Sequence, residues 1–573
     1  MPELFNAATY LLDRHVEQGR GDRVAVDGPA GTLTYAELLA LVGKLGAGLR
    51  ELGVRPEERV VMAASDSPQL LAAILAVMRI GAVAVPVNTM LTGHELGELL
   101  RDARARVAFC SAEFAAAAAQ AAAAAPELRD VVLGPAGSGD HDAAGGGAHP
   151  GDAAAAFPAG ISVTSLAELL ARGSRMGPCL PYPTWADSAA LWLYTSGTTG
   201  TAKGAVHRHA NIRYVAQTYP REVLGITSGD RCYSVAKLFF AYGLGNSAFF
   251  PLAAGATAIL DPARPAPALV AQRLASYQPT LFFAVPSFYT ALLAAGVPAG
   301  ALRSVRLAVS AGETLPAGIY QRFLDRFGVG ILDGIGSTEA LHIFVSNRPG
   351  SVRPGSSGTP VTGYEVDIRD ENGRPVADGL PGDLYLKAPS AALGYWCRTD
   401  ITRKVFQGEW LRTGDVYVRS ADGYYTCLGR STDMIKAGGI WVSPAEVEAR
   451  LLEHPGVAAA AVVGLADADG LETPVACVVR TARQQHEPGP SGAGPDEAAQ
   501  AAELVTFCRA GLAAFKRPRA VLFFESLPTT ATGKLRRFAV REMAAEMLAG
   551  SGPLGGQLAG GQPGAVRPGT QRV

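Results

Sequence analysis

The sequence carries no excess of charge of either sign. Its 51 Lys and Arg residues and 52 Asp and Glu residues leave a formal net charge of −1. Proteins that bind nucleic acid or an anionic membrane surface usually show a strong positive balance. We therefore expect neither nucleic acid nor a membrane as a partner.

Long apolar runs are absent as well. The best candidate, residues 70–87, is interrupted by Arg79 and Gly81, and it predicts a core helix followed by a strand. The first sixteen residues include Glu3 and Asp13 and lack the basic start and apolar middle of a signal peptide. These features favour a cytoplasmic protein.

Cysteine is scarce and scattered. The seven cysteines are odd in number, and none belongs to a C-x-x-C pair. This pattern argues against a disulfide framework and against a zinc site.

The length of 573 residues exceeds that of one ordinary core, so we expect two or more domains. Strands alternate with helices over residues 22–109 and again over 189–332, which predicts an α/β fold. Residues 59–63 and 82–87 are expected to be buried strands on either side of a helix at 68–78. Thr34 and Glu37 have the spacing of a capping box at the start of another helix.

Composition changes twice in the second half of the chain. After Gly355, strands expected at 365–368 and 382–387 are separated by Gly, Pro and Asp turns, which predicts a β-rich subdomain. From residue 433 the pattern is typical of a small α+β domain. Two stretches are of low complexity: the one at about 135–160 is expected to be a mobile surface insertion, and the tail at 546–573 is expected to be disordered.

A Gly-rich stretch at residues 195–204 follows an apolar run that predicts a buried strand. It contains three glycines, five hydroxyl side chains and one lysine, Lys203. Glycine lets the backbone approach a phosphate closely, and successive N–H groups form an anion-binding nest. A Walker loop is excluded because Lys203 is followed by Gly204, where that motif needs Ser or Thr. The alternative is a flexible surface turn.

Five further motifs follow in a fixed order. They are Ser310-Ala311-Gly312-Glu313, Asp333-Gly334-Ile335-Gly336-Ser337-Thr338-Glu339, Trp410-Leu411-Arg412-Thr413-Gly414-Asp415, Gly429-Arg430-Ser431-Thr432-Asp433 continuing to Gly439, and Pro528-Thr529-Thr530-Ala531-Thr532-Gly533-Lys534. Each motif alone is weak. With the Gly-rich stretch and in this order, the chain resembles the acyl-adenylate-forming superfamily of acyl-CoA ligases, adenylation domains and luciferases over about residues 5–545.

Within that superfamily the chain is most similar to benzoate-CoA ligases. Residues 236–246 and the continuation of the second motif into Ala340-Leu341-His342-Ile343-Phe344 carry this resemblance. It implies an AMP-binding and acid-binding N-terminal domain at 1–429, a hinge at 430–433 and a mobile C-terminal lid domain at 434–545. It also implies a monomer or homodimer.

The resemblance implies a reaction in two steps. An aromatic carboxylate attacks the α-phosphorus of ATP with the help of Mg²⁺, and the thiol of coenzyme A then displaces AMP. The phosphopantetheine thiol of an acyl carrier protein is the alternative acceptor. An unrelated ATPase, or a nucleotide-binding protein without catalytic activity, is the rival from another class.

The resemblance also assigns nucleotide contacts. Thr338 would bind the α-phosphate and Glu339 would hold Mg²⁺, for which a carboxylate is a suitable hard ligand. Asp415 would bind the ribose with the help of Arg430, whose alternative role is a structural ion pair. The β- and γ-phosphates would contact Thr195, Ser196, Gly197, Thr198, Thr199, Gly200 and Lys203, and the adenine slot would be formed by Ala311, Gly312, Glu313, Asp333 and Gly334.

The C-terminal domain would contribute to both steps. Lys534 is the expected catalyst of adenylation, since an ammonium group offsets the repulsion between two anions. After rotation, Lys436, Gly438 and Gly439 would complete the thiolation site. Thr432 departs from the family, which usually has Asp or Lys there.

Five residues are the candidates for the acid pocket. They are Phe239, Ala241, Tyr242, Ile335 and His342. Apolar faces with few polar groups suit a flat aromatic acid. The alternative for Phe239 is a plain core aromatic, and His207 and His209 are interpreted as structural or phosphate-adjacent.

Overall fold

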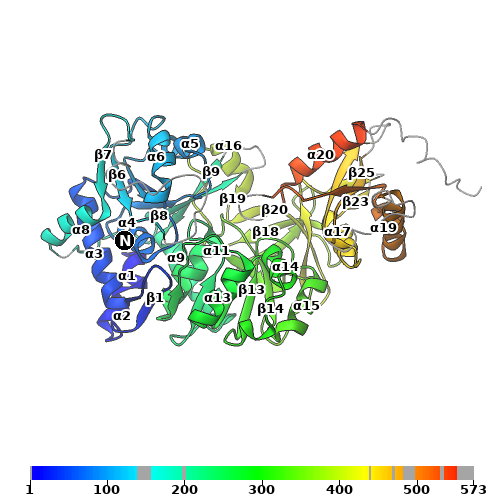
Figure 1. Ribbon diagram of the computed structural model, residues 1–573, viewed down its shortest axis with the longest axis horizontal. Helices are drawn as coiled ribbons and strands as arrows, with labels where there is room; N and C mark the ends of the chain where they lie inside the picture. Colours follow the sequence, from blue (N-terminus) through cyan, green and yellow to red (C-terminus); the bar gives the residue numbers. More distant parts are fainter. Residues whose placement is uncertain are drawn as a thin grey trace, which may run out of the picture. The chain divides into compact units, whose positions relative to one another are not determined.

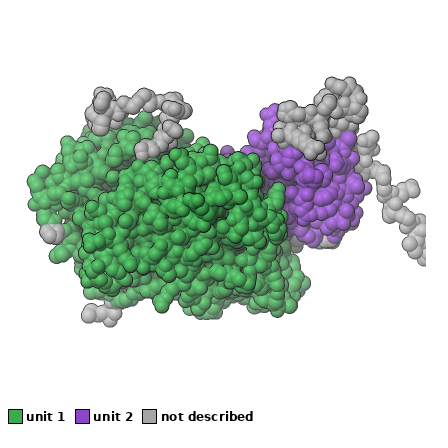
Figure 2. Space-filling model, turned by 60° about the horizontal axis from the view of Figure 1, so that its bottom comes forward, with its two compact units in different colours: residues 1–432, 531–534 green, residues 433–530, 535–573 purple. Residues whose placement is uncertain are grey.

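The computed structural model describes residues 3–137, 156–177, 179–196, 202–437, 440–466, 472–481, 497–529 and 535–550. The chain forms two compact units, and the boundary between them lies at Thr432 and Asp433 (Figure 2). In the part of the chain that the structure describes, no helix has both the length and the apolar character needed to cross a bilayer.

Nine strands form the larger sheet of the first unit (Figure 1). In spatial order they are β16 (Thr359–Pro360), β15 (Ile343–Ser346), β14 (Ile331–Gly336), β13 (Leu307–Ser310), β12 (Leu281–Ala284), β10 (Arg231–Ser234), β11 (Thr257–Ile259), β1 (Val24–Asp27) and β2 (Leu33–Thr34). The strands from β14 to β1 in this order pair in parallel, whereas β15, β16 and β2 are antiparallel. The carboxyl ends of β13 and β14 therefore lie at one edge, where ligands bind in α/β folds.

A second sheet of seven strands belongs to the same unit. Its order is β7 (Ser162–Ser165), β6 (Asp130–Gly134), β5 (Val107–Ser111), β3 (Arg59–Ala63), β4 (Val83–Pro86), β8 (Ala189–Ser196) and β9 (Ala202–Arg208). All neighbours are parallel except β8 and β9. β3 has the bounds predicted from the sequence, whereas β6 and β7 were not predicted, because they flank the low-complexity stretch.

Two helices of the first unit precede β1, and the others lie between strands in the chain. They are α1 (Ala7–Leu11), α2 (Asp13–Glu17), α3 (Tyr35–Glu51), α4 (Pro68–Arg79), α5 (Gly93–Ala103), α6 (Ala115–Ala122), α8 (Leu166–Arg175), α9 (His209–Gln217), α10 (Tyr219–Glu222), α11 (Ala241–Leu244), α12 (Phe250–Ala254), α13 (Pro267–Tyr277), α14 (Pro286–Ala294), α15 (Ala317–Phe327) and α16 (Thr399–Val405), with short turns at Ala112–Phe114, Gly245–Phe249 and Ala299–Leu302. α3 begins at the predicted capping box, in which Thr34 and Glu37 exchange hydrogen bonds.

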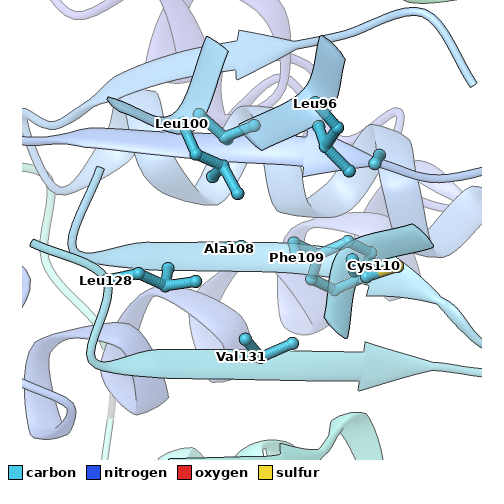
Figure 3. Close-up of a pocket in the computed structure, with 10 residues that line it drawn as sticks. Leu96, Leu100, Ala108, Phe109, Cys110, Leu128 and Val131 are labelled. Carbon is cyan, nitrogen blue, oxygen red and sulfur yellow. The ribbon is translucent and has the colours of Figure 1, made fainter. Parts of the chain in front are cut away.

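Helices α5 and α6 cover one face of the seven-stranded sheet. Leu96 and Leu100 of α5 point toward the strands that carry Ala108 and Val131 (Figure 3). The cavity between them has a volume of about 10 Å³. This space is core packing and is too small for a substrate.

The predicted β-rich subdomain is a third sheet. It contains β17 (Glu365–Arg369), β18 (Gly382–Lys387), β20 (Trp410–Arg419) and β19 (Phe406–Gln407) in this order, and β21 (Tyr425–Arg430) pairs with β20. The structure therefore confirms the large α/β domain with a β-rich part.

The second unit is the predicted small α+β domain. Strands β24 (Val457–Ala466), β25 (Glu472–Arg480) and β26 (Ala520–Phe524) form one sheet, and β22 (Ile435–Ala437) pairs with β23 (Ile440–Val442). The helices are α17 (Pro444–Leu452), α19 (Glu497–Gly511) and α20 (Arg537–Gly550), with a short turn at Ala514–Lys516.

Helix α20 differs from the expected disordered tail at 546–573. It continues to Gly550, because Val540 and Ala544 are fully buried against the sheet and stabilise the helix. Residues 551–573 and 138–155, which include most of the predicted insertion at 135–160, lie outside the described residues.

Candidate active site

The predicted phosphate loop joins two antiparallel strands. Thr195 of β8 lies opposite Lys203 of β9, and Ser196 lies opposite Ala202. The residues between them, Gly197, Thr198, Thr199 and Gly200 among them, lie outside the described residues. The sequence predicts the first strand but not the antiparallel return, because periodicity carries no information on pairing.

Lys203 lies beside a tyrosine that the sequence analysis missed. Its Nζ is 4.9 Å from the centroid of the Tyr395 ring. The Tyr395 hydroxyl donates a hydrogen bond to Glu339 Oε1 at 2.6 Å. Tyr395 therefore connects the phosphate-loop lysine to the predicted metal ligand. The only sequence signal is an aromatic pair after Gly394, which is equally typical of a core turn.

The segment that carries Thr338 and Glu339 is held through its main chain. The carbonyl oxygens of residues 338–340 each accept a hydrogen bond from another element. In order, the donors are the His207 imidazole, the Ala392 main-chain N–H and the Ser390 hydroxyl, each at 2.8 Å. These three contacts fix the position of the predicted phosphate and metal residues.

His207 is fully buried and has a defined tautomer. Its Nε2 faces the Thr338 carbonyl oxygen, which can only accept, so Nε2 carries the proton. Its Nδ1 accepts from Asn211 Nδ2 at 3.0 Å. Burial lowers the pKa of His207 to about 4, so the ring is neutral near pH 7. His209 is also buried, but its Nδ1 accepts from the Ala7 N–H, away from the loop.

The predicted adenine residues directly follow β13 or lie within β14, where Asp333 is the partner in register of Ser310, the last residue of β13. They are Ala311, Gly312, Glu313, Asp333 and Gly334. Burial raises the pKa of Asp333 to about 8, and its Oδ1 has no hydrogen-bond partner in the described part of the chain. A buried oxygen without a partner suits a ligand that carries N–H donors, such as adenine.

Asp415 and Arg430 face each other on β20 and β21. Arg430 Nε is 3.1 Å from Asp415 Oδ1, and the Asp415 side chain is 12% exposed against 57% for Arg430. Arg430 also donates to the Thr413 carbonyl at 3.0 Å. The structural ion pair considered for Arg430 is thus present, and it orients the carboxylate predicted to bind ribose.

The predicted acid-binding residues come from two segments of the first unit. Ala241 and Tyr242 begin α11, and Phe239 lies two residues before it. Ile335 and His342 lie on either side of the Thr338–Glu339 pair. The rings of Tyr242 and His342 have centroids 5.6 Å apart. The structure thus brings these two residues together.

Two of these aromatic residues also have structural contacts. Tyr242 donates its hydroxyl proton to the Val309 carbonyl at 3.1 Å, so toward a substrate this oxygen can only accept. Phe239 is 6% exposed and packs against Phe240, with centroids 4.3 Å apart.

A glycine that was not among the predicted site residues leaves the space in which His342 lies. Gly245 begins a π-helical turn, Gly245–Phe249, and a Cβ on it would lie 2.2 Å from His342 Cδ2. Such turns are frequent at functional sites. Burial lowers the pKa of His342 to about 3, and an interaction with the Tyr242 main chain only partly offsets this effect. The imidazole facing Tyr242 is therefore neutral near pH 7.

The candidates from the second unit are less defined. Lys436 lies in β22, and only its main chain is described. Gly438, Gly439 and Lys534 lie outside the described residues.

Glu339 fits the predicted Mg²⁺ ligand. Its Oε1 accepts the Tyr395 hydroxyl, and within the described ranges Oε2 accepts no hydrogen bond. No group of three or more His, Cys, Asp or Glu side chains in the described part of the chain could hold a metal ion. One carboxylate is sufficient for Mg²⁺, which commonly binds one or two carboxylates together with phosphates and water.

Two family models match the chain. The AMP-binding enzyme model matches residues 12–396, and the AMP-binding enzyme C-terminal domain model matches residues 446–534. The first match alone spans more than half of the chain.

Curated relatives and solved structures agree with this assignment. A benzoate–CoA ligase of Thauera aromatica is 42% identical over 544 residues, covering 94% of this chain and 96% of the relative. The crystal structure of the anthranilate CoA ligase AuaEII in complex with anthranoyl-AMP is 36% identical in sequence and has a TM-score of 0.84. The match covers 96% of this chain and 99% of that chain. The structure of a benzoate CoA ligase from Burkholderia xenovorans LB400 is 39% identical in sequence and has a TM-score of 0.81. The match covers 94% of this chain and 100% of that chain. The chain therefore belongs to the AMP-binding enzyme family.

Proposed function

We propose that this enzyme activates benzoate or a substituted benzoate with ATP, through an aryl-adenylate, and transfers the aryl group to coenzyme A. The relatives named for benzoate and anthranilate support an aromatic acid as the substrate. The proposal includes a cytoplasmic location and the monomer or homodimer expected above.

One observation carries the proposal. The segment 335–342 contains both candidates for binding the acid and candidates for binding phosphate and metal. Ile335 and His342 are the acid-pocket candidates at its ends, and Thr338 and Glu339 are the phosphate and metal candidates between them. A carboxylate bound beside the first pair would lie near phosphates bound at the second pair, as formation of an acyl-adenylate requires.

The chemistry of the first step is the approach of two anions. Lys203 would neutralise charge on the β- and γ-phosphates, and the Thr338 hydroxyl would donate to the α-phosphate. Mg²⁺, held by Glu339, would supply further positive charge to the phosphates. Asp333 and Asp415 would orient the nucleotide.

The second unit is proposed to act in both steps. Lys534 would contact the acid carboxylate and the α-phosphate during adenylation. Residues 430–433 would then act as the hinge for a rotation that brings Lys436, Gly438 and Gly439 to the thiolation site.

Pyrophosphate exchange tests the proposal directly. We expect benzoate, hydroxybenzoates and aminobenzoates to promote exchange of labelled pyrophosphate into ATP, and acetate or a long-chain fatty acid to promote little. Coenzyme A and a phosphopantetheinylated carrier protein are then offered in turn, with coenzyme A expected to react. ATP hydrolysis that does not depend on any aromatic acid would refute the proposal.

Lys534→Ala tests the division between the steps. We expect adenylation to be abolished and thiolation of a supplied benzoyl-adenylate to be nearly unchanged. Lys516→Ala is the matched control in the same unit, because the Lys516 ammonium pairs with Glu446 at 2.7 Å. Equal loss of both steps in Lys534→Ala would contradict this role.

A further inference from the structure

Tyr395 lies between two opposite charges of the site. It is 7% exposed, its hydroxyl donates to Glu339 Oε1 at 2.6 Å, and the Lys203 ammonium lies 4.9 Å from the centroid of its ring. Across the described residues, Lys203 and Glu339 form no ion pair with each other. The Tyr395 side chain therefore contacts both charged groups, Glu339 through a hydrogen bond from its hydroxyl and Lys203 through its ring.

The tyrosine has little freedom to move. Its N–H donates to Thr402 Oγ1 at 2.9 Å, and its ring packs edge-on against Phe406 with centroids 5.5 Å apart. The next residue, Trp396, donates from Nε1 to the Asp102 carbonyl at 3.0 Å. The backbone and the ring of Tyr395 are thus held in place by contacts outside the site.

The two contacts of Tyr395 leave both charges available. The Tyr395 hydroxyl donates to Glu339 Oε1 and therefore occupies only one of the two carboxylate oxygens. A ring face attracts an ammonium group through its quadrupole without neutralising its charge.

Resting on the proposed function, we infer that Tyr395 is a positioning residue that keeps Lys203 and Glu339 apart. The ring holds the ammonium where it can bind phosphate, and the hydroxyl holds the carboxylate with one oxygen directed to a magnesium ion. Without the tyrosine, the two groups would be free to pair with each other. Each would then be less available to the nucleotide and the metal.

The two functions of the side chain can be separated by substitution. Tyr395→Phe keeps the ring and removes the hydroxyl, so we expect Mg²⁺ to bind about tenfold more weakly, the lower end for loss of a group that orients a metal ligand. Binding of the nucleotide without metal is expected to stay within twofold. Tyr395→Ala removes both contacts and is expected to weaken both kinds of binding.

The measurement needs no turnover. Isothermal titration of the full-length protein with α,β-methylene-ATP is performed once with EDTA and once over a range of Mg²⁺ concentrations. Tyr35→Phe is the control, because the buried Tyr35 hydroxyl donates to the Ala256 carbonyl at 2.8 Å in another part of the unit. Melting curves of all variants establish that each is folded.

The outcomes are distinct. Weaker Mg²⁺ binding in Tyr395→Phe, with normal metal-free binding and a normal Tyr35→Phe control, supports the inference. An unchanged Mg²⁺ dependence in Tyr395→Phe overturns it. An equal loss of Mg²⁺ binding in Tyr395→Phe and in the control Tyr35→Phe overturns it as well. Pyrophosphate exchange by the wild-type protein is measured in parallel, so that failure of the proposed function, seen as no acid-dependent exchange, is distinguished from failure of the inference.

Discussion

His207 offers a test of how the Thr338 segment is positioned. Two substitutions divide its hydrogen bonds. His207→Gln can keep an N–H near the position of Nε2, which serves the Thr338 carbonyl, and it loses the acceptor for Asn211. His207→Asn can keep an acceptor near the position of Nδ1 and loses the donor to Thr338.

The structure gives the expected magnitudes. In His207→Asn the Leu341 N–H at 3.1 Å is the one donor to the Thr338 carbonyl that remains among the described residues. A lost buried hydrogen bond costs about 1 kcal/mol in net terms, and if it appears in the transition state it lowers kcat/KM about 5- to 10-fold. In His207→Gln, Asn211 keeps its hydrogen bond to the Ala391 carbonyl at 3.1 Å, and we expect kcat/KM for pyrophosphate exchange within about threefold of the wild type.

The pH dependence of stability gives an independent measurement. The folded-state pKa of His207, about 4, lies below the ordinary value of 6.5, because burial disfavours the charged ring. The unfolded chain therefore binds the additional proton between these values, and this contribution to stability is complete above pH 6.5 and is lost as the pH falls toward 4. For one proton the wild type should lose about 2 kcal/mol relative to either variant between pH 7.5 and pH 5.

Urea denaturation at several pH values measures this difference. A gap between wild type and variant that stays constant from pH 7.5 to 5 would refute the assigned burial and tautomer. Equal exchange rates for His207→Asn and His207→Gln would refute the role of the Thr338 contact.

Two further predictions concern the acid and ribose sites. Gly245→Ala should raise the KM for the aromatic acid by tenfold or more with little change in the KM for ATP, because the new Cβ would collide with His342. The control is Gly43→Ala, because no atom lies within 4 Å of a Cβ at that position. Equal effects of Gly245→Ala on both KM values would contradict the predicted acid pocket. Asp415→Ala should cost less than about 1 kcal/mol of stability, since its partner Arg430 is mostly exposed, yet weaken ATP binding at least tenfold in a titration; unchanged ATP binding would remove Asp415 from the nucleotide site.

The sequence by itself determined the α/β alternation, several individual elements and the order of the motifs. The strand at Arg59–Ala63 and the capping box at Thr34 depend on neighbouring residues only, so local patterns were sufficient to predict them. The family motifs likewise predict that Thr338, Glu339 and Asp415 belong to a nucleotide site, without any knowledge of their contacts.

Only the tertiary structure decided which residues support these motifs. Tyr395 contacts Glu339 across 56 positions, and His207 contacts Thr338 across 131 positions. No periodicity or propensity encodes such contacts, because both describe residues within a few positions of each other. The role of Gly245 is of the same kind, since it depends on the empty space that His342 fills when the chain folds.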